Sequence, residues 1–147
     1  MKSLLAAAMM LAAAVTTAGA EMIKVKSAHS VEATADRLAA AVEGAGAKVF
    51  ARIEHSKGAA SVGMELAPAV TLIFGNPKLG TPAMQAAITM GLDLPLRALV
   101  YGDSSDVWVL YHDPADVAAL HGLPGDHPVI GKMQGALKKL TGKATAE

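Results

Sequence analysis

The chain has 147 residues, no cysteine, and 13 basic residues against 13 acidic ones. Its charge balance argues against a nucleic-acid partner, and one Trp, two Tyr and two Phe offer no stacking platform for bases. The lack of cysteine excludes thiol chemistry and disulfides, so hydrophobic burial must stabilise the fold.

The first 20 residues have the pattern of a secretory signal peptide. Lys2 precedes an apolar run over residues 4–15, and Ala18 and Ala20 provide the small residues that signal peptidase accepts. The run is too short to span a bilayer, and the junction lacks the cysteine of a lipoprotein. We therefore expect a mature protein that begins at Glu21, is exported to the periplasm or secreted, is soluble, and forms one domain over residues 21–147.

The first half of this domain reads as strand, helix, strand. Residues 22–26 alternate as a half-exposed strand does, and Ser30 can cap a helix whose apolar residues share one face. Gly44 or Gly46 ends that helix, and residues 48–54 alternate again. Residues 55–68 show no clear periodicity, and we expect a loop there.

The stretch from Val70 to Gln85 is the centre of the prediction. Residues 70–74 are apolar or β-branched without alternation, which predicts a strand covered on both faces. Gly75 and Gly80 then permit a tight loop, after which Thr81 is a suitable N-cap and Pro82 a suitable first residue for a helix to about residue 89.

The remaining residues predict a hairpin followed by two helices. Residues 96–101 and 107–112 are strand segments joined by a five-residue polar loop over 102–106. Asp113-Pro114 and His127-Pro128 each begin a helix, and these helices end near Gly122 and Gly142. The order β-α-β-β-α-β-β-α-α predicts an α+β fold, a mostly antiparallel sheet of about five strands with helices on one face.

The loop over residues 75–81 is the most favourable place for a ligand. Its two glycines can expose backbone amides, a helix begins directly after it, and Lys78 adds a positive charge. We therefore name Asn76, Lys78, Gly80 and Thr81 as ligand-binding candidates for an anionic or polar small molecule. A nucleotide is not expected, because Thr81-Pro82 stands where a phosphate-binding loop has Lys-Ser or Lys-Thr. The same residues also suit an ordinary strand-to-helix connection.

Other polar residues give weaker indications of a catalytic, ligand-binding or metal site. His55, beside Glu54 and Glu65, and Asp93 are conceivable acid and base groups or ligand contacts, but they are scattered along the chain. His121, Asp126 and His127 share a flexible segment that could fold onto one metal ion, although both histidines also suit helix ends. We expect no metal and no cofactor.

Several spaced motifs resemble one family of proteins. They are Phe74-Gly75-Asn76-Pro77-Lys78, Gly80-Thr81, Met84-Gln85, Gly91-Leu92-Asp93-Leu94-Pro95-Leu96, Leu99-Val100, Trp108-Val109-x-Tyr111, Asp113-Pro114 and Leu120-His121-Gly122. Together they resemble the domain of unknown function numbered 302. The resemblance implies a compact α+β fold and subunits that pair, hence a homodimer.

Two positions depart from this family's pattern. Many relatives have a cysteine where this chain has Gly75, so no thiol role carries over. His112 stands where relatives often have Asn or Asp, so a metal or hydrogen-bond role does not carry over either.

Three classes of function stay open. A non-catalytic small-molecule module is favoured, a structural or protein-interaction subunit is the alternative, and a small hydrolase or isomerase is third. Convergence of Asn76, Lys78, Thr81 and His55 on one pocket would favour binding, and a flat apolar patch would favour interaction. We expect no membrane partner after signal cleavage.

Overall fold

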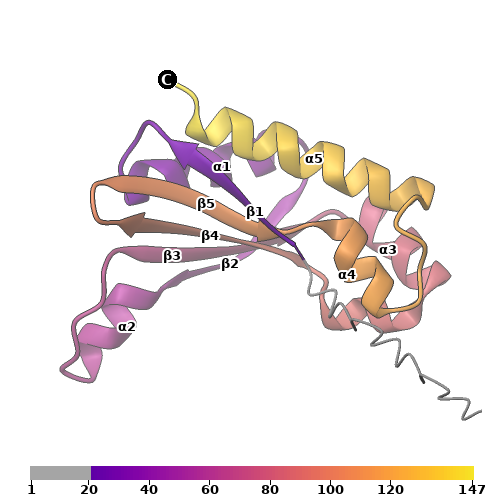
Figure 1. Cartoon of the computed structure of the whole chain (residues 1–147), viewed down its shortest axis with the longest axis horizontal. Coiled ribbons are helices and arrows are strands. Elements are labelled where there is room, and N and C mark those ends of the chain that lie inside the picture. The colour runs from indigo at the N-terminus through magenta and orange to yellow at the C-terminus, as the bar shows by residue number, and fades with distance from the viewer. Residues whose placement is uncertain (1–20) are drawn as a thin grey trace, which may run out of the picture.

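A computed structural model describes residues 21–147, so the predicted signal peptide lies outside the described residues. The elements follow in chain order (Figure 1): β1 (Met22–Ser27), α1 (Val31–Gly44), β2 (Lys48–Glu54), α2 (His55–Ser61), β3 (Ala69–Gly75), α3 (Pro77–Ala86), the 3₁₀ helix η1 (Ile88–Leu92), β4 (Leu96–Asp103), β5 (Asp106–His112), α4 (Pro114–Leu120) and α5 (Pro128–Thr145).

The strands form one antiparallel sheet in the order β1-β5-β4-β3-β2. The two longest helices, α1 and α5, lie side by side on the same face of this sheet (Figure 1). The predicted α+β architecture is therefore confirmed.

The main core lies between the sheet and these two helices. Along β3, Val70, Leu72 and Phe74 are buried against α1 and α5, whereas Thr71 and Ile73 point to the opposite face and are half-buried. The prediction that β3 is covered on both faces is wrong, because α1 and α5 pack on one side of the strand only, and Thr71 and Ile73 on the other side remain half-buried.

Local capping explains where the two long helices begin. The Ser30 hydroxyl accepts a hydrogen bond from the Ala33 amide at 3.2 Å, as predicted for the start of α1. At α5, the ring of His127 accepts from the Val129 amide at 3.4 Å and Pro128 follows in the first turn. The α5 helix runs past Gly142 to Thr145, because Leu140 and Ala144 remain buried in the main core.

A second apolar cluster occupies one end of the molecule, where α3, η1 and α4 meet the first half of α5 (Figure 1). Its fully buried members include Ala83, Met90, Ile130 and Met133. This cluster packs the segment after β3 firmly against α5, and it thereby positions the residues predicted to bind a ligand.

Three further predicted element boundaries are wrong. Residues 55–61 form α2 where a loop was expected. The β4–β5 connection has only Ser104 and Ser105 between the paired residues Asp103 and Asp106, with Ser104 at a φ of 51°. Serine rarely adopts this left-handed conformation. Neither of the two turn residues is the glycine that would have indicated so tight a turn.

The third boundary concerns the predicted site. The helix begins at Pro77 and not at Pro82, because Asn76 provides the N-cap. Gly80, Thr81 and Pro82 therefore lie inside α3, and Thr81 is not a cap.

Candidate functional site

The backbone amides at the start of α3 already donate hydrogen bonds within the protein. The Asn76 side-chain oxygen accepts from the Lys78 amide at 2.9 Å, and its amide nitrogen donates to the Gly46 carbonyl at 3.1 Å. The amides of Leu79 and Gly80 each donate to the Asn76 carbonyl at 2.9 Å. The backbone groups that were expected to face an anion are therefore engaged within the protein.

Beside this helix start lies a hollow of about 250 Å³, which we call the loop pocket. Its lining comes from β2, the β3–α3 junction, α3, the connector before β4 and α5: Phe50, Gly75, Asn76, Pro77, Leu79, Gly80, Thr81, Met84, Leu94, Pro95, Leu96 and Met133. Most of these side chains are apolar, so the pocket favours an apolar group over a bare ion.

Gly75 lies where two walls of the pocket meet. A Cβ atom at this position would lie 3.5 Å from the Pro95 Cβ and 3.6 Å from Cε2 of Phe50. Phe50 itself is 50 % exposed, and the ammonium of Lys48 lies 5.7 Å from the centre of its ring. An exposed aromatic ring with a nearby cation thus forms the rim of the pocket.

Three of the six predicted site residues line this pocket, namely Asn76, Gly80 and Thr81. Within the described chain, the Thr81 hydroxyl makes no hydrogen bond, and it is the polar group of the lining that is free to meet a ligand. Lys78 is exposed on α3 outside the lining.

His55 and Asp93 lie elsewhere. His55 bonds through Nε2 to the Thr71 hydroxyl at 2.8 Å, on the sheet face away from α1 and α5. Asp93 contacts Nε2 of His121 at 2.7 Å and Nη2 of Arg97 at 3.1 Å. The predicted set therefore divides among three places in the fold.

The His121–Asp93 pair was not foreseen, because 28 positions separate the two residues. The His121 side chain is 8 % exposed and ties the end of α4 to the segment after η1. His127 caps α5, and among residues 21–147 no three histidine or acidic side chains are grouped as metal ligands would be.

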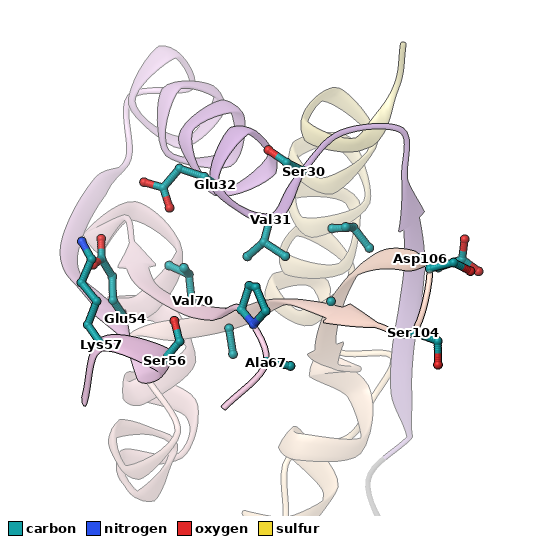
Figure 2. A pocket seen from close by; sticks show the side chains of 15 residues that line it. Ser30, Val31, Glu32, Glu54, Ser56, Lys57, Ala67, Val70, Ser104 and Asp106 are labelled. Atoms are coloured by element: carbon teal, nitrogen blue, oxygen red, sulfur yellow. The ribbon is translucent and has the colours of Figure 1, made fainter. Parts of the chain in front are cut away.

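A larger hollow of about 510 Å³, which we call the hairpin cleft, opens at the other end of the sheet (Figure 2). Val31 and Val70 lie in its floor, Glu54 and Lys57 on one side, and Ser104 and Asp106 on the other. No residue of the predicted site lines it.

The charges of the hairpin cleft are paired. Arg52 contacts Glu32 at 2.7 Å, Lys26 contacts Asp106 at 2.7 Å, and Lys57 contacts Glu54. The hydrogen bond from Lys57 holds the pKa of Glu54 below its usual value. The cleft therefore shows no preference for a charged ligand.

Fold and site together define a small α+β domain with an apolar pocket at a strand-to-helix junction. The chain matches the family model described as "Domain of unknown function DUF302" over residues 23–140 and belongs to this family. The sequence motifs that resembled the family are thereby confirmed.

The fold is also found in a solved structure, the uncharacterized conserved protein DUF302 from Bacillus stearothermophilus. The likeness has a TM-score of 0.77 and covers 84 % of this chain and 97 % of that one, at 16 % sequence identity. It supports the fold alone.

Curated relatives are found among proteins named fluoride-specific ion channels. FluC 1 of Brucella suis biovar 1 and FluC 1 of Brucella abortus biovar 1 are each 46 % identical over 103 residues, which is 69 % of this chain. The match covers 41 % and 38 % of those proteins, so the chain spans about two-fifths of their length. Within residues 21–147, no helix is both long and apolar enough to cross a membrane.

Proposed function

We propose that the domain is a non-catalytic binding module whose ligand occupies the loop pocket. The observation that carries the proposal is the pocket itself, formed by segments far apart in the sequence around three of the residues that the sequence singled out. Its volume of about 250 Å³ lies just below the usual range of about 300–1,000 Å³ for ligand pockets, so the ligand is small.

The lining sets the chemistry of the ligand. Leu79, Met84 and Leu94 provide an apolar interior, which suits a short hydrocarbon body. The Thr81 hydroxyl can bond a polar head, and Lys48 beside the Phe50 rim favours a negative one. The ligand class is therefore a small amphipathic molecule with a polar or anionic head, for which a medium-chain carboxylate is a suitable probe.

A bare inorganic anion suits this pocket less well. An ion such as fluoride or phosphate would lose its hydration against apolar side chains without gaining backbone amides, since those of Leu79 and Gly80 donate to Asn76. The names of the Brucella relatives therefore do not specify fluoride as the ligand of this domain.

The experiment is a thermal-shift titration with octanoate, its neutral amide, phosphate and fluoride. We expect octanoate to raise the midpoint most, the amide less, and the two inorganic ions not at all. Lys48→Ala should remove the preference for octanoate over the amide.

A blocking variant makes the test specific to the loop pocket. A Cβ atom at Gly80 would meet only Leu94, at 4.0 Å, so Gly80→Leu can fill the pocket without a backbone clash. Gly135→Leu is the matched control, on the exposed side of α5 with nothing within 4 Å of its Cβ position. Binding that persists in Gly80→Leu, or is lost equally in both variants, contradicts the proposal.

A second candidate is an accessory role beside an ion channel, in keeping with the interaction alternative. The observation that favours it is the 46 % identity with segments of proteins named fluoride-specific ion channels. Affinity purification of a tagged FluC-type channel in mild detergent, with this chain added, tests it. Co-elution with the channel and not with an unrelated membrane protein is the expected result, and equal recovery with both baits contradicts it.

A further inference from the structure

Residues 55–68, which we call the arm, connect β2 to β3 and carry an exposed apolar surface. The arm contains α2, and its main contact with the sheet is β3. In Figure 1 it projects from the end of the sheet. Val62, Met64 and Leu66 are 70 %, 65 % and 53 % exposed. Three large apolar side chains so exposed within five residues are unusual for a segment that meets only water.

The second half of the arm has an unpaired backbone. Residues 64–68 form no helix or strand and lead directly into β3. Within the described chain, the amides and carbonyls of Glu65, Leu66 and Ala67 make no hydrogen bond to another backbone group. Pro68 restricts Ala67 to extended conformations. This segment therefore offers free donors and acceptors, as the edge of a sheet does.

The neighbouring strands leave this segment free to pair. The β2 strand ends at Glu54, which pairs with Val70, and the chain then turns into α2. On the other side, the Gly102 amide donates to the Pro68 carbonyl at 3.0 Å, and in the described chain the bonds between β3 and β4 extend no further in this direction. An added strand would therefore meet open backbone and would displace no existing pairing.

A groove lies beside the unpaired segment. The arm lines a hollow of about 490 Å³ with six residues: Ser56, Ala60, Met64, Glu65, Leu66 and Ala67. Ser56 and Ala67 also line the hairpin cleft (Figure 2), so the two hollows adjoin, and together we call them the arm groove. Val31 and Val70 lie in the floor at one end of this groove, and Met64 lines the other end. The groove can therefore receive apolar side chains of an extended chain.

One charge of the arm groove has no counter-charge. The acids of the hairpin cleft have basic partners, whereas Glu65 makes no ion pair among residues 21–147. Opposite charges that face each other across two paired strands stabilise the pairing, and like charges weaken it. A strand with a Lys or Arg side chain opposite Glu65 would thus complement the groove.

We infer that the arm binds an extended peptide segment of a partner protein, which pairs with the backbone of residues 65–67 as an added strand. A peptide backbone presents donors and acceptors at the spacing of a strand, which a lipid or a small molecule does not. Because side chains alternate along a strand, the peptide carries apolar residues beside Met64 and Leu66 and a basic residue beside Glu65. The arm groove shares no residue with the loop pocket, so this inference does not depend on the proposed function.

Two peptides test the inference. They are a capped, fluorescently labelled hexapeptide, Val-Thr-Val-Lys-Val-Thr, and the same peptide with Glu in place of Lys. Fluorescence anisotropy during titration with the full chain measures the dissociation constant of each. We expect the lysine peptide to bind about fivefold more tightly than the glutamate peptide. Glu65→Lys should reverse this preference, because the charge opposite the peptide changes sign.

Two variants locate the binding surface. Leu66→Asp should weaken binding of the lysine peptide at least tenfold and leave the thermal midpoint of the chain unchanged, because the Leu66 side chain is exposed. Leu92→Asp is the matched control, since Leu92 is also an exposed leucine but lies on η1. It should leave the affinity for the lysine peptide unchanged.

Pairing through the backbone has a test of its own. Alternate amides of a strand donate to the same neighbour, so N-methylation blocks pairing at one set of alternate positions and not at the other. We therefore compare two lysine peptides, one N-methylated at the odd positions and one at the even positions. One should lose affinity at least tenfold, and the other should bind within twofold of the parent peptide.

Several outcomes overturn the inference. They are no binding of either peptide up to about 1 mM, a preference that Glu65→Lys leaves unchanged, an equal loss in Leu66→Asp and Leu92→Asp, and an equal affinity of the two methylated peptides. A chain that binds neither peptide but forms a dimer that Leu66→Asp dissociates assigns the arm to a second copy and also overturns it.

Discussion

At the scale of single residues, Phe74 and Lys78 have opposite roles although only four positions separate them. Phe74 is 1 % exposed at the end of β3, and Lys78 is exposed in the first turn of α3. Removing the Phe74 ring leaves a cavity, so Phe74→Ala should lower the free energy of unfolding by about 3–5 kcal/mol. Lys78→Ala should change it by no more than about 0.5 kcal/mol. Urea midpoints measure both, and equal losses would contradict the assigned positions.

Asn76 joins two parts of the chain through one side chain. It caps α3 through its oxygen and bonds Gly46, 30 positions earlier, through its nitrogen. Asn76→Ala should therefore destabilise the protein by about 1–2 kcal/mol. Asn76→Asp keeps the capping oxygen but loses the amide donor. Its chemical-denaturation midpoint should therefore fall between those of the wild-type chain and Asn76→Ala. If Asn76→Asp is as unstable as Asn76→Ala, the cap contributes nothing.

At the scale of elements, the same substitution should have opposite signs at two glycines. Gly80 lies inside α3 with open space around its Cβ position, so Gly80→Ala should raise stability by up to about 1 kcal/mol. Gly46 follows α1 at a φ of 73°, so Gly46→Ala should lower stability by about 1 kcal/mol. Thermal unfolding of both variants measures this. A loss at Gly80 would show that helix propensity does not determine the stability of α3.

Element boundaries also explain the errors of the sequence analysis. Both Asn76-Pro77 and Thr81-Pro82 read as a cap followed by a proline, and local propensity could not choose between them. The contact of Asn76 with Gly46 and the burial of Ala83 in the second cluster favour the earlier start. Pro82 is then tolerated inside the helix, at the cost of one backbone hydrogen bond.

At the scale of the whole molecule, export remains a prediction. The charged start, the apolar run over residues 4–15 and the Ala18-Gly19-Ala20 junction indicate cleavage before Glu21. Expression of the full chain in a bacterial host should yield envelope-associated protein whose intact mass corresponds to residues 21–147. Recovery of the uncleaved chain from the cytoplasm would contradict the prediction.

The sequence by itself determined the fold class, the family and the element order apart from the short helices α2 and η1, which it did not indicate. These follow from local patterns: alternation predicted β1 and β2, apolar spacing predicted α1, and cap-and-proline pairs predicted the starts of α4 and α5. It also directed attention to residues 75–81, three of which line the loop pocket. The residues of each such pattern are close together in the sequence, so a single sequence is enough to recognise it.

Only the tertiary structure decided which distant residues meet. The pairing of His121 with Asp93, the link from Asn76 to Gly46, and the meeting of Phe50 with Gly75 and Pro95 all join segments far apart in sequence. Which face of the sheet is left uncovered likewise depends on strand order and on where α1 and α5 pack. These contacts form because the free energy gained by packing the whole chain exceeds the cost of its lost conformational entropy. Every segment contributes to that balance, so no local sequence pattern predicts it.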